Sequence, residues 1–107
     1  MKQKIFVEFD GVLNTYTGWH GEDELFEPRD GSADFLRMLS KNFQVFVFTA
    51  RDREKVYKWL IRHHLDDYIC DVINKKEPEH LYIDDRAVRF DGDYGQTIRE
   101  IENFQPH

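Results

Sequence analysis

Residues 4–13, KIFVEFDGVL, decide the fold of this chain. An apolar run this short, closed by Gly11, is typical of a buried strand in a parallel sheet. Side chains alternate along a strand, so Glu8 and Asp10 are expected to leave it on the same side. Two adjacent carboxylates repel each other, and a divalent cation, which prefers oxygen ligands, would relieve that repulsion. The alternative is that both acids lie on the surface of an edge strand, although acids are depleted in strands.

The composition predicts a single domain over residues 1–107. A chain of 107 residues with 40% hydrophobic and 15% aromatic residues can build one core, which argues against disorder. The formal net charge of −6 disfavours nonspecific binding to a phosphate backbone. We find no apolar segment of transmembrane length and no signal-peptide core, so we expect no membrane partner and a cytoplasmic location. The one cysteine, Cys70, lies in an apolar run and is expected to be a buried thiol.

The remainder of the chain alternates between expected strands and helices. Residues 14–28 contain three glycine or proline breaks and no helical period, which predicts a short flap. Helices are expected over 33–41, capped by Asp30 or Ser32, over 53–65, capped by Asp52, and over 97–104; strands are expected over 44–49, 68–73 and 80–84, with a minor fifth strand near Phe90. This alternation predicts an α/β fold with a parallel sheet and helices on both faces.

Polar residues gather where these strands end. Ligands of open parallel sheets bind beyond the carboxyl ends of the strands. The residues expected there are Glu8 and Asp10 after the first strand, Thr49 after the second, Asp84 and Asp85 after the fourth, and Lys75 and Lys76 in the turn before it. Carboxylates that hold a metal, combined with hydroxyl and ammonium groups that bind phosphate oxygens, suit phosphoryl transfer.

The spacing of these residues resembles the haloacid dehalogenase (HAD) superfamily. Its phosphatases carry a D-x-D-G-x-L motif, a Thr or Ser after the second strand, a Lys and a final acidic pair. The corresponding segments are E-F-D-G-V-L at 8–13, T-A-R at 49–51, K-K at 75–76 and I-D-D-R at 83–86. The resemblance covers nearly the whole chain. It implies a Rossmann-like three-layer sandwich with the sheet order 5-4-1-2-3.

The resemblance also implies roles for the site residues. Residue 8 would be the nucleophile and a ligand of Mg²⁺, and Asp10 would be the general acid and base, with its main-chain carbonyl on the metal. Thr49 would bind the transferred phosphoryl group and Lys76, or else Lys75, would neutralise it. Asp85 would be the next metal ligand, with Asp84 beside it. Further candidates for substrate binding are Ala50, Arg51, Arg86 and Trp19. Either arginine could instead pair with a neighbouring acid, and Trp19 could instead anchor the flap by packing.

The departure from the family pattern is Glu8, where the family has aspartate. The extra methylene displaces the attacking oxygen, and a misplacement of ~1 Å can cost about 100-fold in rate. Three explanations stay open: an engineered substitution in an active enzyme, a natural loss of catalysis, or a site adjusted to glutamate.

Together these features predict a capless, Mg²⁺-dependent phosphomonoester hydrolase that forms an acyl-phosphate on residue 8. With only a flap beside the site, the phosphorylated substrate could be bulky, such as a nucleic-acid end, a protein or a sugar, or a second subunit could close the site. The alternative is a metal- or phosphate-binding module without turnover. A response-regulator receiver ranks last, because the third strand is followed by Asn74 and not by the aspartate that a receiver phosphorylates.

Overall fold

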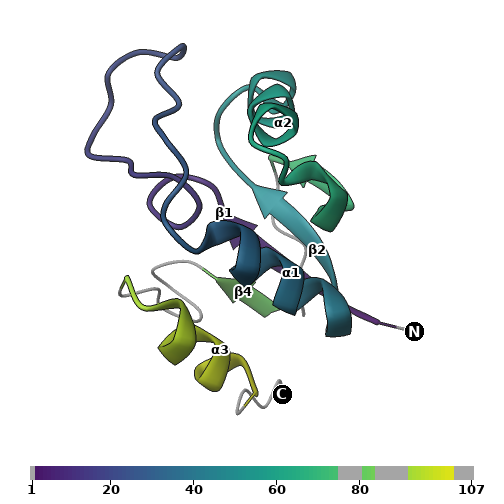
Figure 1. The fold of residues 1–107 in the computed structure, drawn as a ribbon. Helices are drawn as coiled ribbons and strands as arrows, with labels where there is room; N and C mark the ends of the chain where they lie inside the picture. The colour runs from purple at the N-terminus through teal and green to yellow at the C-terminus, as the bar shows by residue number, and fades with distance from the viewer. Residues whose placement is uncertain (1, 75–80, 84–91, 103–107) are drawn as a thin grey trace.

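The computed structural model describes residues 2–74, 81–83 and 92–102. Strands and helices alternate along the chain, as Figure 1 shows. In chain order the elements are β1 (Gln3–Glu8), α1 (Ser32–Asn42), β2 (Phe43–Phe48), α2 (Arg53–Arg62), the 3₁₀ helix η1 (Asp66–Tyr68), β3 (Asp71–Ile73), β4 (Leu81–Ile83) and α3 (Tyr94–Glu102).

The four described strands form one parallel sheet in the order β3-β2-β1-β4. In the register of the sheet, Val7 of β1 lies opposite Val47 of β2 and Ile83 of β4. The near-continuous apolar runs of β1 and β2 therefore form the two central strands, as expected for strands buried in a parallel sheet. This confirms the predicted α/β class. The fifth strand expected near Phe90 lies outside the described residues, so the five-strand order stays a prediction.

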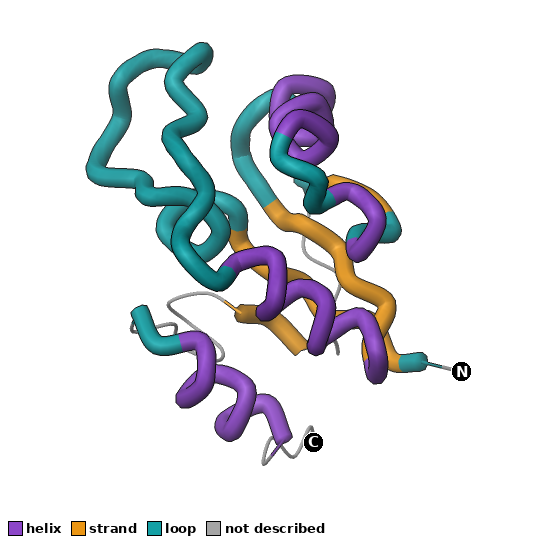
Figure 2. Tube along the Cα trace, in the orientation of Figure 1, coloured by secondary structure: helices purple, strands orange, loops and turns teal. Residues whose placement is uncertain are grey.

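The hydrophobic core lies on one face of the sheet. Ile5 and Val7, which share one side of β1, are fully buried in a cluster to which all three helices contribute. The helical members are Phe35, Leu36 and Leu39 of α1, Val56, Trp59 and Leu60 of α2, and Ile101 of α3. Figure 2 shows α1 crossing in front of the strands. On the opposite side of β1, Phe6 stacks on Phe46 with ring centroids 5.3 Å apart. The predicted second layer of helices is not found in the part of the chain that the structure describes.

The two long helices begin in different ways. α1 follows Gly31, whose φ of +88° suits glycine, and no side chain caps it. The predicted caps, Ser32 and Asp30, are therefore wrong, because Ser32 is itself the first helical residue and is buried. The predicted Asp52 cap of α2 is confirmed, because its side chain accepts the N–H of Lys55 at 3.1 Å.

The ends of the elements also differ from the predictions. α2 stops at Arg62 and not at residue 65, because His64 adopts the left-handed φ of +58° that ends a helix. β3 begins only at Asp71, since η1 occupies the start of the predicted strand. The prediction that Cys70 is buried is wrong: its side chain is exposed just before β3, while its main-chain N–H donates to the carbonyl of Val45 at 2.7 Å. None of the described helices has the length and apolar character needed to cross a bilayer.

Tyr94, the first residue of α3, joins three elements. Its ring stacks on Phe35 of α1 with centroids 4.5 Å apart, and its hydroxyl donates to the carbonyl of Val12 in the turn after β1. Burial disfavours the phenolate and raises the pKa of Tyr94 to about 12. A side chain at Gly31 would approach this ring, since an added Cβ would lie 3.3 Å from it. α3 is thereby fixed against the segment that leads out of β1.

The raised pKa of Tyr94 predicts a loss of stability at alkaline pH. An unfolded tyrosine titrates near pH 10, so between about pH 10 and 12 the unfolded chain loses a proton that the folded chain keeps. The contribution of this group is therefore complete below pH 10 and is lost as the pH rises through 12. Urea unfolding at a series of pH values should show the stability difference between wild type and Tyr94→Phe shrinking over that range. A difference that does not change with pH would contradict the assignment.

Candidate functional site

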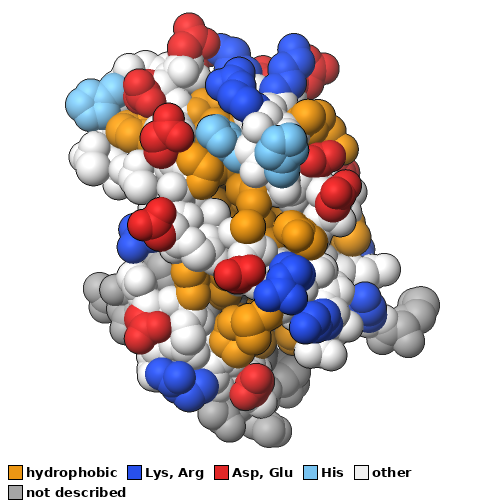
Figure 3. Space-filling model, viewed as in Figure 1, with side chains coloured by type: hydrophobic (Ala, Val, Ile, Leu, Met, Phe, Trp, Pro, Cys, Tyr) orange, Lys and Arg blue, Asp and Glu red, His pale blue; other side chains and the backbone are white. Residues whose placement is uncertain are grey.

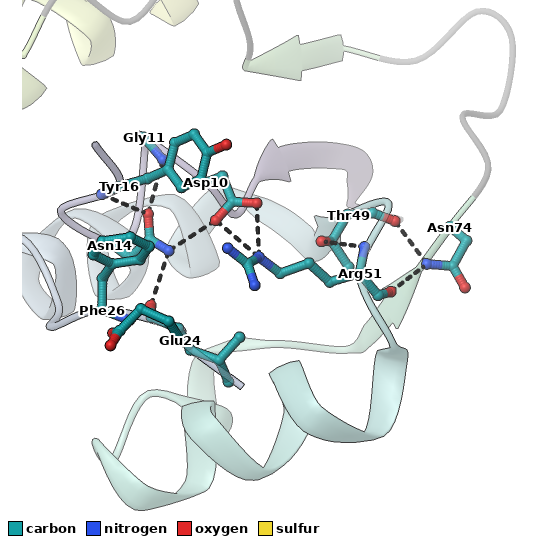
Figure 4. A network of polar contacts seen from close by, with 10 residues as sticks. Asp10, Gly11, Asn14, Tyr16, Glu24, Phe26, Thr49, Arg51 and Asn74 are labelled. Atoms are coloured by element: carbon teal, nitrogen blue, oxygen red, sulfur yellow. Dashed lines mark hydrogen bonds and ion pairs between the residues drawn. The ribbon is translucent and has the colours of Figure 1, made fainter. Parts of the chain in front are cut away.

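Four polar side chains meet beyond the carboxyl ends of β1 and β2. Asp10 and Asn14 lie in the turn that follows β1, and Thr49 and Arg51 follow β2. Figure 4 shows the guanidinium of Arg51 reaching across to the Asp10 carboxylate, with Asn14 on the other side of that carboxylate. Parallel strands bring their carboxyl ends to the same edge of a sheet, which explains why residues 41 positions apart in sequence meet here.

An ion pair between Asp10 and Arg51 is the centre of the site. Nε of Arg51 donates to both carboxylate oxygens of Asp10, at 2.8 and 3.0 Å. The Arg51 side chain is only 5% exposed and that of Asp10 is 24% exposed. A guanidinium stays charged even when buried, so its burial requires an acceptor such as this carboxylate. The sequence left open whether Arg51 binds substrate or pairs with an acid. Its Nε is seen to pair with an acid, Asp10.

The two terminal nitrogens of Arg51 have no such partner. Nη1 and Nη2 are buried and hydrogen-bond to no atom of the described residues. Aromatic rings surround the guanidinium instead, with its carbon 5.1 Å from the ring centroid of Trp19, 5.8 Å from Tyr16 and 6.0 Å from Phe9. Cation–π contacts offset part of the charge but leave the in-plane N–H groups unsatisfied. Leaving a buried donor unpaired costs about 1–3 kcal/mol, so this position favours a bound acceptor.

Asn14, which the sequence analysis did not identify, holds the turn beneath this ion pair. It is fully buried, and its Nδ2 donates to Oδ1 of Asp10 and to the carbonyl of Leu25, both at 3.0 Å. Its Oδ1 accepts the main-chain N–H of Gly11 at 2.8 Å and of Tyr16 at 3.2 Å. The preference of asparagine for turns was the one signal in the sequence, and it does not distinguish a buried residue from an exposed one.

The flap predicted over residues 14–28 is present and is closed at its base like a hairpin. Asn14 and Pro28 form an antiparallel bridge, and the N–H of Thr15 donates to the carbonyl of Glu27 at 2.9 Å. Further along, Nε1 of Trp59 in α2 donates to the carbonyl of Phe26 at 2.8 Å. Phe26 has a φ of +65°, a strained conformation for a bulky residue that such surrounding contacts must hold.

The tip of the flap is joined to α2 by charge. The ammonium of Lys55 lies 2.9 Å from Asp23 and 3.0 Å from Glu22, and the hydrogen bonds to Asp23 and then Glu22 raise the pKa of Lys55. Acidic and basic side chains lie together over the flap tip and α2 in Figure 3. Because exposed ion pairs contribute little to stability, the buried bonds of Asn14 and Trp59 hold the flap more firmly than Lys55 does.

Thr49 and Asn74 fix the turn that carries Arg51. Thr49 is buried at the end of β2, and its Oγ1 accepts the N–H of Arg51 at 3.0 Å. Nδ2 of Asn74 donates to the carbonyls of Thr49, at 2.6 Å, and of Arg51, at 3.0 Å. The Thr49 hydroxyl keeps its own O–H to donate. Ala50, between Thr49 and Arg51, is exposed at the rim.

Of the other predicted site residues, the structure describes Glu8 and Trp19 but not the rest. Glu8 is the last residue of β1, half-buried and opposite Phe48 in the register. Trp19 is 62% exposed, which contradicts its alternative role as a packing anchor of the flap. The remaining predicted site residues lie outside the described residues, namely Lys75, Lys76, Asp84, Asp85 and Arg86. Within residues 2–74, 81–83 and 92–102, no three His, Cys, Asp or Glu side chains gather into a metal-binding group.

The hydrogen bonds of Asn14 predict a large effect of a small substitution. Asn14→Ala leaves two buried N–H groups and a carbonyl without partners, and should lower the free energy of unfolding by about 2–4 kcal/mol in urea unfolding. Asn14→Asp keeps the acceptor but loses both donated bonds and places a second carboxylate beside Asp10, so it should not rescue stability. Asn42→Ala, at an exposed asparagine of α1, is the matched control and should change stability by less than about 0.5 kcal/mol. Equal stability of Asn14→Ala and Asn42→Ala would show that the network contributes nothing.

Comparisons with known proteins add no relative. No family model, no curated protein and no solved structure matches the chain. The likeness to HAD phosphatases therefore rests on the motifs in the sequence, and the function has to be argued from the site itself.

Proposed function

We propose that this chain is a Mg²⁺-dependent phosphomonoester hydrolase of the HAD type, with its site at the carboxyl ends of β1 and β2. The observation that carries the proposal is the buried guanidinium of Arg51, which binds Asp10 through Nε and has no partner in the described residues at Nη1 and Nη2. Two adjacent N–H donors in one plane match the paired oxygens of a phosphoryl group.

The neighbours of Arg51 suit the same ligand. The O–H of Thr49 is available as a further donor beside the turn that carries Arg51. Because Asp10 already neutralises the arginine, the pair does not attract every anion by net charge alone. The selectivity of the site among anions then comes from the geometry of its N–H and O–H donors. This geometry favours a tetrahedral oxyanion with several oxygens. Lys76 and Arg86 are proposed to complete the phosphate-binding group.

Two carboxyl groups at the carboxyl end of β1, those of Glu8 and Asp10, would carry out the reaction. A carboxylate oxygen of Glu8 attacks phosphorus while the bond from phosphorus to the ester oxygen breaks. For this step Asp10 has to be in its protonated form, in which its carbonyl oxygen can still accept a hydrogen bond from Arg51. It gives that proton to the departing alcohol, which leaves an acyl-phosphate on residue 8. Asp10 then accepts a proton from a water molecule as the water oxygen attacks phosphorus. This second step releases inorganic phosphate and restores both carboxyl groups.

We propose that Glu8 and Asp10 contribute ligands to a magnesium ion. Glu8 offers a carboxylate, and no donor among the described residues hydrogen-bonds to the main-chain carbonyl of Asp10. Hard cations prefer such oxygen ligands, and we propose that Asp85 and Asp84 supply the others. When bound, the ion would offset negative charge on the phosphoryl oxygens. The five-strand order 5-4-1-2-3 and the three-layer sandwich belong to this same proposal.

The glutamate at position 8 supports a second candidate, a phosphate- or metal-binding module without turnover. Its side chain is one methylene longer than the aspartate of the family motif. An attacking oxygen displaced by ~1 Å can lower the rate about 100-fold, while ligand binding persists. The two candidates share the Arg51 site and differ only in whether residue 8 reaches phosphorus.

Restoring the shorter side chain tests the reaction. Glu8→Asp should hydrolyse an aryl phosphate in the presence of Mg²⁺ at least about 100-fold faster than the wild-type chain, because the attacking oxygen returns to reach of phosphorus. Glu8→Ala, without nucleophile or ligand, should be inactive. Asp10→Asn in the Glu8→Asp background should lose most of the gain for want of a proton donor. If Glu8→Asp binds phosphate but turns over none of several phosphomonoesters, the binding module replaces the hydrolase.

Removing the guanidinium tests the phosphate site without requiring turnover. Arg51→Met keeps the apolar stem, and titration calorimetry with inorganic phosphate should show at least about a tenfold loss of affinity. Arg51→Lys should recover little of it, since an ammonium cannot offer two donors in one plane. Arg62→Met, at an exposed arginine of α2, is the matched control and should bind phosphate like wild type. Equal affinities of Arg51→Met and Arg62→Met would remove the basis of the proposed function.

A further inference from the structure

We propose that Trp19 is a stacking platform and that the substrate is a nucleotide-like phosphomonoester, in which a flat aromatic ring is joined to the phosphate through a sugar. This inference rests on the proposed function, because it places the phosphate of that molecule on Arg51. It adds the substrate class, which the residues around Arg51 alone do not select.

The position of Trp19 is unusual for so large an apolar side chain. It is 62% exposed, whereas the other tryptophan, Trp59, is 1% exposed in the core. Its described contact is with the guanidinium of Arg51, which lies over one face of the ring at 5.1 Å from the centroid. With one face against Arg51, the exposed area includes the opposite face. The indole ring of Trp19 thus lies between the buried guanidinium of Arg51 and the solvent.

The flap holds this ring in place. Gly18 and Gly21, on either side of Trp19 and His20, have φ values of +135° and +99°, which only glycine adopts readily. An added Cβ at either position would meet no atom within 4 Å, so backbone conformation and not space requires glycine there. The flap is fastened on both sides of this segment, at its base by Asn14 and at Phe26 by Trp59. A ring held in advance loses little conformational entropy when a ligand stacks on it.

The distances suit a sugar between ring and phosphate. A planar group stacked on the outer face of Trp19 would lie about 3.5–4 Å from the indole, and so roughly 9 Å from the guanidinium carbon. A phosphate bonded to Nη1 and Nη2 lies close to that carbon. The separation that remains is about the length of one ribose. Aryl phosphates, in which ring and phosphate are directly joined, would not span it.

Charge distinguishes a free nucleotide from the phosphorylated end of a nucleic acid. The chain carries a formal net charge of −6, and Glu22, Asp23, Glu24 and Glu27 are exposed on the flap that bears Trp19. A long polyanion would be repelled by this flap, whereas a mononucleotide brings only one phosphate. We therefore assign the ligand as a nucleoside monophosphate. Because stacking accepts every base, the site should not depend strongly on base identity.

The experiment compares ligands that add the sugar, the base and then a nucleic-acid chain to the phosphate, one part at a time. Affinities of the wild-type chain are measured by titration calorimetry for inorganic phosphate, ribose 5-phosphate, a nucleoside 5′-monophosphate and a 5′-phosphorylated oligonucleotide. The nucleotide should bind about tenfold more tightly than ribose 5-phosphate. Trp19→Ala should reduce this ratio to near one, and Trp19→Phe should keep part of it. Tyr57→Ala, which removes an aromatic side chain that is 40% exposed on α2, is the matched control and should retain the full ratio.

The outcomes separate this inference from the proposed function. If phosphate and ribose 5-phosphate bind through Arg51 but the nucleotide gains nothing, the platform is wrong and the phosphate site stands. If no phosphate compound binds, the proposed function fails first. A Trp19→Ala variant that loses phosphate and nucleotide affinity equally would show that Trp19 only packs on Arg51, which overturns the platform. An oligonucleotide that binds more tightly than the mononucleotide would overturn the assignment to a free nucleotide.

Discussion

The structure depends on one constraint, which is that a guanidinium cannot be buried without compensation. Arg51 meets it by binding the carboxylate of Asp10 through Nε and by lying among the rings of Phe9, Tyr16 and Trp19. These contacts tie together the end of β1, the turn after β2 and the flap. Since Nε alone has a hydrogen-bonding partner in the described residues, the arrangement that stabilises the fold also leaves two donors for a ligand.

The turn after β1 is held from two directions, and this fixes the orientation of Asp10. On one side Asn14 bonds to the carboxylate of Asp10 and to main-chain groups of the turn and the flap. On the other side the hydroxyl of Tyr94 bonds to the carbonyl of Val12, and its ring stacks on α1. In the proposed phosphoryl transfer such support would keep Asp10 in position, since misplacement of a reacting group is costly. The same support makes stability and site geometry depend on the same few residues.

The flap combines firm and weak attachments. Buried hydrogen bonds from Asn14 and Trp59 fasten its base and its returning strand, while exposed ion pairs of Lys55 join its tip to α2. Through Tyr16 and Trp19 the flap also lies against the guanidinium of Arg51.

The sequence by itself determined the elements that hydrophobic patterning controls. The apolar runs of 4–13 and 44–49 predicted the two central strands, the breaks in 14–28 predicted the flap, and Asp52 predicted the start of α2, because these signals are local. Tertiary structure decided what depends on contacts between distant segments. It selected Asp10 as the partner of Arg51, buried Asn14 at the centre of the turn, left Trp19 and Cys70 exposed, and gathered the described helices on one face. No local pattern encodes these outcomes, because each is set by which buried polar group lies within hydrogen-bonding distance of another once the chain has folded.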